Sequence, residues 1–473
     1  MVYEIGERVQ GFTSPLNVLV PAFVYRWWPE WDYWGPLWAF RFFGLCVLTG
    51  GFGYFLRKAE FDGGARWLFL TLVALQMKTV AFAMNGQEAA LWIGFLAPAL
   101  WCAARGHGAF WLPAGLCWAG LMWTRPDNPV YIAALATGGL LFCPEARKSQ
   151  WRGVAKAALV TTLLYGPWFV WTWSYYGNPV PHTILAKFGS TPAAVDPAAW
   201  VTRFADSWLM AVGRPFEPVY AEAGGWPAWL FLLTRSLGLW CALRWLWAGA
   251  GVLRRMSGWI YFCGTLYLAN VGTVGAMYPW YFPPLGLAGA VVLALDLHEM
   301  GQRCATRKVA KWGARVGTGA LLAGFAWVAL FAFEQQRVRQ VLIEHGVREQ
   351  VGRWLKANVQ PGERVFLEPL GYIGYFSEAR MQDFPGLVSP AVVQARRTYG
   401  NTYIAVIDAL QPEWVVLRGG ELLALEKIEA FRNTYEPVHR VRARDGISGY
   451  ADFPGSKFIF ADGLFVVMRR KSP

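Results

Sequence analysis

The chain has 473 residues, of which 55% are apolar, 16% aromatic and 16% charged, and its formal net charge is +13. Soluble domains carry about 25% charged residues, so this composition excludes an ordinary soluble enzyme. It also excludes a disordered chain, because such chains are poor in apolar and aromatic residues. The 28 tryptophans fit a chain with many membrane–water boundaries, where indole rings are enriched. The sequence therefore predicts a polytopic α-helical membrane protein.

The basic residues are gathered in short clusters between apolar segments, which is the pattern of cytoplasmic loops in membrane proteins. The clusters are Arg57-Lys58, Arg147-Lys148-Arg152, Arg254-Arg255, and Arg303, Arg307, Lys308, Lys311, Arg315. This distribution argues against nucleic-acid binding as the origin of the positive charge. No pair among the seven cysteines has CxxC spacing, so neither a disulfide framework nor a zinc site is predicted.

Residues 1–36 are predicted to be an outer loop with an interfacial helix. The stretch 14–25 (SPLNVLVPAFVY) is too short to cross hydrocarbon and suits a helix lying in the interface. If the first span runs from outside to inside, these residues must cross the membrane without a signal peptide or an earlier helix. Either a short, nearly neutral tail crosses unaided, or an upstream helix is missing and Met1 is an internal methionine.

Residues 37–334 are predicted to form the transmembrane domain, in which each crossing helix needs about 17–25 residues. Candidate spans fall near 37–56, 66–84, 88–104, 109–124, 129–143, 154–174, 227–250, 257–276, 282–298 and 316–333. With every basic cluster in the cytoplasm, these ten spans alternate without conflict. The outer loops are then 85–88, 125–128, 175–226 and 277–281, and the tail after 334 is also outside.

Residues 335–473 are predicted to form an extracytoplasmic α/β domain, because charge rises and short alternating segments replace long apolar runs. Helices are expected at 335–357, near 390–410 and at 420–434, and strands at 365–367, 372–376, 414–417, 436–442 and 458–469.

The outer loop 175–226 opens with the stretch Tyr175–Lys187, which reads Tyr-Tyr-Gly-Asn-Pro-Val-Pro-His-Thr-Ile-Leu-Ala-Lys. Its two prolines hold the backbone extended and present His182 and Lys187 at the membrane surface. Lysine is a flexible point cation suited to phosphate, and histidine donates or accepts a proton near neutral pH. The alternative is a rigid loop with a lysine that snorkels to the interface.

Further charged residues lie at or near the outer helix ends. Glu88 begins a span, where a carboxylate either takes part in binding or stabilises the helix terminus. Arg125 and Asp127 follow another span and form either a binding site or a local ion pair. Lys78 lies within an apolar helix, where a cation is expensive and indicates function, unless it snorkels outward.

Tyr278, Trp280 and Tyr281 lie at the outer end of another span, as part of an aromatic belt or as a platform for a sugar face or lipid head. Together, the residues at these helix ends predict a cationic pocket at the membrane boundary, roofed by the C-terminal domain. Such a pocket suits an amphiphile with a phosphate.

Six stretches resemble GT-C glycosyltransferases that use polyprenyl-phosphate sugars, especially the type that includes the mycobacterial terminal arabinofuranosyltransferase. Gly6–Leu16 is similar to the family's "GErVeGyTSPLW", and 85–88 stands where the family has "SGlEt". Thr124–Asp127 is similar to "tRPdg", Tyr176–Lys187 to "YGdplPNTfyaK", Tyr278–Tyr281 to "yPWYf", and Gly371–Leu387 to "GaigYfsg…vDl.GL". His182 departs from this pattern, because the family has Asn there, and Asn85 and Gln87 alter the turn before Glu88.

The resemblance implies transfer of a sugar from a polyprenyl-phosphate donor to a glycan or lipid acceptor outside a bacterial plasma membrane. Lys187 and Arg125 would then meet the phosphate and His182 the head group or acceptor. Glu88 would orient a sugar hydroxyl, and Asp127 would be a further substrate-binding residue. Tyr278, Trp280 and Tyr281 would line the sugar or lipid, and residues 335–473 would help to bind the acceptor.

The catalytic base is not assigned to any residue of this chain. In the family an acidic pair, in a loop upstream of the first stretch, supplies the base and in some relatives a divalent-cation site. The chain opens at Met1-Val2-Tyr3, where the family reads "GlvYn", so no metal ligand or cofactor is assigned either. Two other functions remain open at this point, namely a lipid-linked-sugar transporter or flippase, and an inactive N-terminally truncated scaffold.

Overall fold

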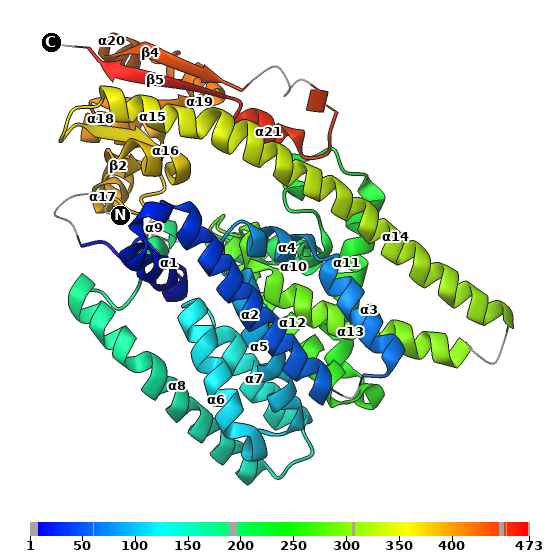
Figure 1. Ribbon diagram of the computed structural model, residues 1–473. Helices are drawn as coiled ribbons and strands as arrows, with labels where there is room; N and C mark the ends of the chain where they lie inside the picture. The colour runs from blue at the N-terminus through cyan, green and yellow to red at the C-terminus, as the bar shows by residue number, and fades with distance from the viewer. Residues whose placement is uncertain are drawn as a thin grey trace.

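The computed structural model describes residues 8–59, 61–188, 196–304, 308–443, 449–450 and 452–471. The expectations for Met1–Tyr3, for Gly6 and Glu7 of the first stretch and for Arg307 lie outside these residues. Within them, a large helical bundle lies below a smaller α/β domain (Figure 1).

The first half of the bundle follows the predicted apolar windows. Its helices are α1 (Pro15–Trp27), α2 (Trp34–Lys58), α3 (Gly63–Ala74), α4 (Met77–Met84), α5 (Ala89–Arg105), α6 (His107–Thr124), α7 (Pro129–Phe142) and α8 (Arg147–Tyr176). α1 begins where predicted, because the Ser14 side chain accepts a hydrogen bond from the backbone N–H of Asn17 at 3.3 Å. The window 66–84 is divided into α3 and α4, which meet at a bend of 58°.

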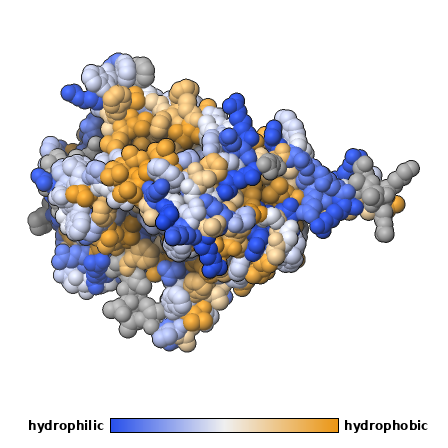
Figure 2. All heavy atoms as spheres, turned by 90° about the horizontal axis from the view of Figure 1, so that it is seen from below, coloured by the Kyte–Doolittle hydropathy of each residue, from blue (hydrophilic) through white to orange (hydrophobic). Residues whose placement is uncertain are grey.

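The second half comprises α9 (His182–Phe188), α10 (Pro197–Gly213), α11 (Ala228–Leu243), α12 (Val252–Gly272), α13 (Pro283–Arg303) and α14 (Lys308–Val338). Among the described residues, four helices are long and apolar enough to cross a membrane, or five if the bent α3–α4 pair counts as one span. Many of their apolar side chains lie on the surface, as Figure 2 shows for the end of the molecule opposite the α/β domain. These features support a membrane protein, while the ten spans and their orientation stay predictions.

The segment expected to be the loop 175–226 contains two helices, and one of them is packed into the bundle. Tyr261 of α12 donates a buried hydrogen bond to the carbonyl of Val212 in α10 at 2.6 Å. A Cβ added at Gly238 of α11 would lie 1.9 Å from the same carbonyl, so the two helices are in close contact. α10 is therefore part of the helical core, and the chain returns from it toward the α/β domain through 214–227.

The C-terminal domain contains a sheet in the order β2-β1-β3-β5-β4. The strands are β1 (Arg364–Leu367), β2 (Arg380–Asp383), β3 (Trp414–Arg418), β4 (Tyr435–Arg442) and β5 (Leu464–Arg470). β1 pairs in parallel with β2 and β3, whereas β5 is antiparallel to β3 and β4. The predicted α/β class of this domain is confirmed.

Helices cover both faces of this sheet. They are α15 (Glu349–Asn358), α16 (Leu370–Ser377), α17 (Pro390–Tyr399), α18 (Tyr403–Leu410), α19 (Gly419–Leu425), α20 (Glu429–Thr434) and α21 (Ser456–Ala461). Buried residues of α15 and α16 share one core with the sheet, and those of α17, α18 and α19 share another.

Four local expectations for this domain were wrong. The helix expected at 420–434 is divided into α19 and α20, because the chain turns at 426–428, where the N–H of Ile428 donates to the carbonyl of Leu425 at 2.9 Å. Residues 372–376 lie in α16 rather than in a strand, because α16 packs its buried face against α15. The helix expected near 390–410 is divided into α17 and α18 at Gly400, whose φ of 117° is unfavourable for residues with a side chain. The strand expected at 458–469 begins only at Leu464, after α21.

The two parts are joined by a continuous helical segment and by direct contacts. α14 continues through a π-helical stretch, Arg339–Arg348, into α15 beneath the sheet (Figure 1). The rings of Tyr220 and Phe458 stack at 3.8 Å, and the N–H of Gly455 donates to the carbonyl of Gly224 at 2.9 Å. The return segment 214–227 is thus a docking point for the C-terminal domain.

Candidate functional site

Arg125 forms a buried ion-pair cluster at the helix ends beneath the C-terminal domain. Its Nη1 donates to Oε1 of Glu88 at 2.5 Å, and its Nε donates to Oδ1 of Asp127 at 2.8 Å. Arg125 is only 3% exposed. The guanidinium therefore compensates two carboxylates in a largely water-free position, which is the ion-pair arrangement considered as the alternative for Arg125.

Aromatic side chains hold this cluster in place. The Arg125 guanidinium carbon lies 4.8 Å from the centroid of the Trp92 ring and 4.7 Å from that of Tyr281, which are distances of a cation–π contact. The Tyr267 hydroxyl donates to Oδ2 of Asp127 at 3.2 Å. Trp92 in turn donates from Nε1 to Oδ1 of Asn128 at 2.5 Å. Each charged group thus has a fixed orientation.

Lys187, which lies in α9, contacts Tyr281 as well. At the end of α9, its Nζ donates to the Tyr281 hydroxyl at 3.0 Å and lies 5.4 Å and 5.5 Å from the ring centroids of Tyr278 and Tyr281. Among the described residues, no carboxylate is paired with Lys187. Arg125 and Lys187 therefore meet at the Tyr281 ring, and Lys187 is the cation whose charge is not already compensated there.

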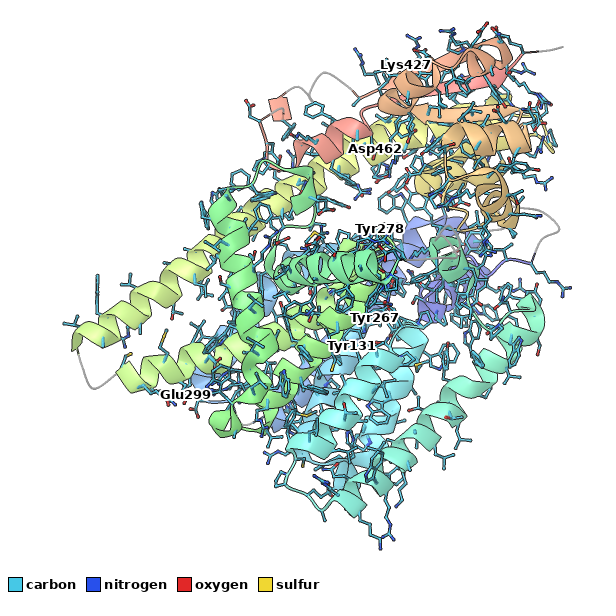
Figure 3. The ribbon with its side chains drawn as sticks, turned by 180° about the vertical axis from the view of Figure 1, so that it is seen from behind. Tyr131, Tyr267, Tyr278, Glu299, Lys427 and Asp462 are labelled. Carbon is cyan, nitrogen blue, oxygen red and sulfur yellow. The ribbon has the colours of Figure 1, made fainter. Side chains whose placement is uncertain are left out.

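The aromatic residues after α12 form a rigid shelf beside Lys187. Pro279–Tyr281 is a short 3-10 turn, and the rings of Tyr278 and Trp280 stack at 4.5 Å with an interplanar angle of 6°. Figure 3 shows Tyr278 at the end of the bundle that faces the C-terminal domain. Burial raises the pKa of Tyr278, as does the carboxylate of Glu368 in that domain, whereas Arg396 lowers it.

Contacts join seven of the predicted site residues to one another. Glu88, Asp127, Arg125, Tyr281, Lys187, Tyr278 and Trp280 form a connected set. His182 is half-buried and begins α9, the short helix that ends with Lys187, which places it near this set by position in the chain.

Lys78 has a structural role instead of contributing to this set. Its Nζ donates to the carbonyls of Arg214, Glu217 and Pro218 at 2.6, 2.5 and 3.0 Å, and the residue is 2% exposed. The buried ammonium therefore fixes the turn that follows α10, and it does not snorkel to the surface.

Sequence reasoning missed Trp92, Asn128 and Tyr267, which hold the charged groups. They lie within apolar helices or beside a proline, where the sequence offers no signal that separates them from ordinary core residues.

The cluster does not fit a divalent cation, because the carboxylates of Glu88 and Asp127 are already paired with Arg125. Within the ranges that the structure describes, no group of three or more His, Cys, Asp or Glu side chains is placed to hold a metal ion. No step of the chemistry is therefore assigned to a metal.

The chain is similar to a family model over its C-terminal domain and to a solved structure. A family model described as a domain of unknown function (DUF8728) matches residues 332–456, from the end of α14 to the start of α21. The comparison with curated proteins gives no match. Among solved structures, the crystal structure of ArnT from Cupriavidus metallidurans bound to undecaprenyl phosphate is similar over 97% of this chain and 88% of that chain, with 13% identity and a TM-score of 0.47.

Proposed function

We propose that this chain is a membrane glycosyltransferase that moves a sugar from a polyprenyl-phosphate donor to an acceptor outside the plasma membrane. The observation that carries the proposal is the Lys187 ammonium, which has no carboxylate partner among the described residues and is bonded to Tyr281 between two aromatic rings. The proposal includes the predicted orientation, with the C-terminal domain on the outer side.

A phosphate is the ligand that this position suits best. Lysine provides a mobile point charge with several donor hydrogens, and a partly desolvated setting strengthens its interaction with an anion. Transfer from a sugar phosphate breaks the bond between the anomeric carbon and the phosphate oxygen while the acceptor oxygen bonds to that carbon. A cation beside the leaving phosphate therefore stabilises its developing negative charge. Lys187 is our candidate for this task.

Arg125 supports this site in a different way from the one that the resemblance implies. Its three hydrogen bonds to Glu88 and Asp127 use most of its donor capacity, and its ring contact holds Tyr281. We therefore assign Arg125 the positioning of Tyr281 and of the two carboxylates. Glu88, with Asp127, remains our candidate for a sugar hydroxyl, and His182 for the head group or acceptor.

The test measures binding of undecaprenyl phosphate to the full chain in nanodiscs. A charged hydrogen bond contributes about 1.5–3 kcal/mol, so Lys187→Ala should weaken binding about ten- to a hundredfold, and Lys187→Arg should restore part of it. Lys156→Ala is the matched control, because Lys156 also lies over an aromatic ring, 5.4 Å from the Trp111 centroid, but on α8. Equal binding by the wild type and Lys187→Ala would refute the assignment.

A second readout separates transfer from transport. With a labelled polyprenyl-phosphate sugar in proteoliposomes, a glycosyltransferase forms a new glycosidic bond on an added acceptor. Movement of the intact labelled lipid between leaflets, without such a bond, would identify a flippase and overturn the proposal.

A further inference from the structure

A second cluster of charged side chains lies where α11 ends and the chain turns into α12. Its central residue is Asp296 of α13. This helix begins at Pro283, directly after the aromatic shelf, so Asp296 lies about 20 Å further along its axis at a rise of about 1.5 Å per residue. Figure 3 shows Glu299, which follows Asp296 on α13, well away from Tyr278 and the C-terminal domain. The cluster is therefore separate from the candidate site around Lys187.

Asp296 accepts hydrogen bonds from side chains of three different elements. Nε1 of Trp240 in α11 donates to its Oδ2 at 2.7 Å. Nε of Arg244, in the 3-10 turn after α11, donates to the same oxygen at 3.0 Å. Nη1 of Arg254 in α12 donates to Oδ1 at 2.8 Å. Asp296 thus holds the Arg244 side chain in a fixed place at this end of the bundle.

The cluster carries an excess of positive charge. Its cations are Arg244, Arg254 and Arg303, and its carboxylates are those of Asp296 and Glu299, which are paired with them. Three guanidinium groups against two carboxylates leave one positive charge uncompensated within the cluster. Because the charges of a binding site and its ligand are complementary, an anion is the ligand that this cluster suits.

Arg244 is the residue through which the cluster can bind such an anion. Only its Nε is bonded to Asp296, and in the described part of the chain its two Nη groups make no hydrogen bond and are not enclosed. Its guanidinium carbon lies 5.4 Å from the ring centroids of both Trp240 and Trp247. Contact with two rings restricts the orientation of the guanidinium. The Nη groups therefore form a pre-oriented fork, the geometry with which arginine binds a phosphate through two hydrogen bonds.

Exposed apolar side chains on α11 form a stripe that leads toward Arg244. They are Trp229, Leu232, Leu233, Trp240 and Leu243. Their spacing follows the helical repeat, so they lie on one face of α11. Arg244 lies about 17 Å beyond Leu233 along the helix, which matches the about 15 Å of hydrocarbon in one leaflet of a bilayer. The stripe therefore suits the acyl chains of a lipid whose phosphate meets the Arg244 fork.

We propose that Arg244, beside Trp240 and Trp247, binds the phosphate of an anionic phospholipid whose acyl chains lie along α11. The ammonium of a zwitterionic head group would add a further cation to a cluster that already has an excess, so phosphatidylglycerol is favoured over phosphatidylcholine. Indole rings are enriched at the level of lipid head groups, which fits the position of both tryptophans. With the predicted orientation, this is the cytoplasmic leaflet, whose anionic lipids attract such basic clusters.

A purely structural role for Arg244 explains fewer of these observations. An ion pair between this turn and α13 needs only the bonds from Nε to Asp296. It leaves the two Nη groups without an acceptor, and it does not require an apolar stripe that ends at the guanidinium. The lipid site is also independent of the proposed transfer reaction, because it contains none of the residues assigned to the donor.

The test measures lipid binding to the purified full chain by native mass spectrometry, with phosphatidylglycerol or phosphatidylcholine added to the detergent solution. The wild type should bind the first phosphatidylglycerol about tenfold more tightly than phosphatidylcholine. Arg244→Ala should weaken phosphatidylglycerol binding about tenfold or more, because charged hydrogen bonds are lost. Arg244→Lys should restore part of it, since the charge stays but the fork is lost. No preference of the wild type for phosphatidylglycerol would overturn the inference.

Arg303→Ala is the matched control. It removes the same charge from the same cluster, but the Arg303 side chain is 79% exposed. Trp247→Ala is a second site variant that breaks no ion pair, and it should weaken phosphatidylglycerol binding about threefold or more. Thermal unfolding checks that each variant is folded. Equal binding by the wild type and both site variants would overturn the inference, and so would a loss in Arg303→Ala as large as that in Arg244→Ala, because the effect would then reflect diffuse charge.

Two further arms identify the source of the phosphate. Glycerol 3-phosphate is added as a competitor, and displacement of phosphatidylglycerol at equal concentration would identify a site for a soluble anion and overturn the lipid assignment. Undecaprenyl phosphate is titrated in the same way. If Arg244→Ala weakened its binding as much as that of phosphatidylglycerol, the site would belong to polyprenyl phosphate and the inference would fail. Lys187→Ala should leave the first phosphatidylglycerol unaffected, which separates this site from the proposed donor site.

Discussion

Replacing Arg125 with methionine tests whether its buried ion pairs organise the candidate site. The substitution keeps an unbranched side chain but leaves the carboxylates of Glu88 and Asp127, each with 10% side-chain exposure, without their counter-charge. Removing one partner of a buried pair costs about 3–5 kcal/mol. That is a large share of the about 5–15 kcal/mol by which proteins are stable, so Arg125→Met should sharply lower the free energy of unfolding.

The assay is reversible unfolding of the purified chain in mixed micelles by increasing detergent denaturant. Arg303→Ala is the control, because Arg303 pairs with Glu299 one helical turn away while its side chain is 79% exposed, and such a pair contributes about 0.5 kcal/mol or less. Adding Glu88→Gln and Asp127→Asn to Arg125→Met should recover part of the loss, since the neutral cluster needs no counter-charge. If Arg125→Met lowered the free energy of unfolding as little as Arg303→Ala does, the ion pairs of Arg125 would not organise the site.

The sequence predicted the helices of the bundle well, because long apolar runs bounded by basic clusters leave few alternatives in a chain of this composition. It failed where tertiary contacts decide the structure. α10 has fewer apolar residues than a typical span, yet it is packed against α11 and α12 through the close approach at Gly238. Residues 372–376 are rich in strand-forming side chains but are helical, since their contacts with α15 override the local preference.

For the site, too, the sequence indicated which residues matter but not which individual contacts they make. Charged residues at helix ends drew attention to Glu88, Arg125 and Lys187, because a charge beside an apolar segment is conspicuous. The sequence also predicted that these residues share one pocket with Tyr281, but not the individual bonds between them, such as the one that joins Lys187 to Tyr281 across 94 residues of the chain. The contacts of Lys78 could not be predicted either. Its three acceptors are backbone carbonyls of a turn more than a hundred residues away, and backbone carbonyls have no signature in the sequence.

Two further predictions concern groups outside the proposed binding sites. Lys78→Met should lower the free energy of unfolding by several kcal/mol, because each buried carbonyl at 214–218 that loses its donor costs about 1–3 kcal/mol. Hydrogen exchange of the backbone amides in this turn should rise. Unchanged exchange would show that Lys78 does not hold the turn in place. The last concerns acid stability of the C-terminal domain. Although burial acts in the opposite direction, hydrogen bonds from Arg364 lower the pKa of Glu413 from 4.5 to about 2. A carboxylate with a depressed folded-state pKa stabilises the fold fully above its unfolded value and loses this contribution as the pH falls. The difference in melting temperature between the wild type and Glu413→Gln should therefore be constant above pH 4.5 and shrink toward pH 2. A difference that stays constant through this range would show that the ionised Glu413 carboxylate does not contribute, because glutamine has no proton to gain over this interval.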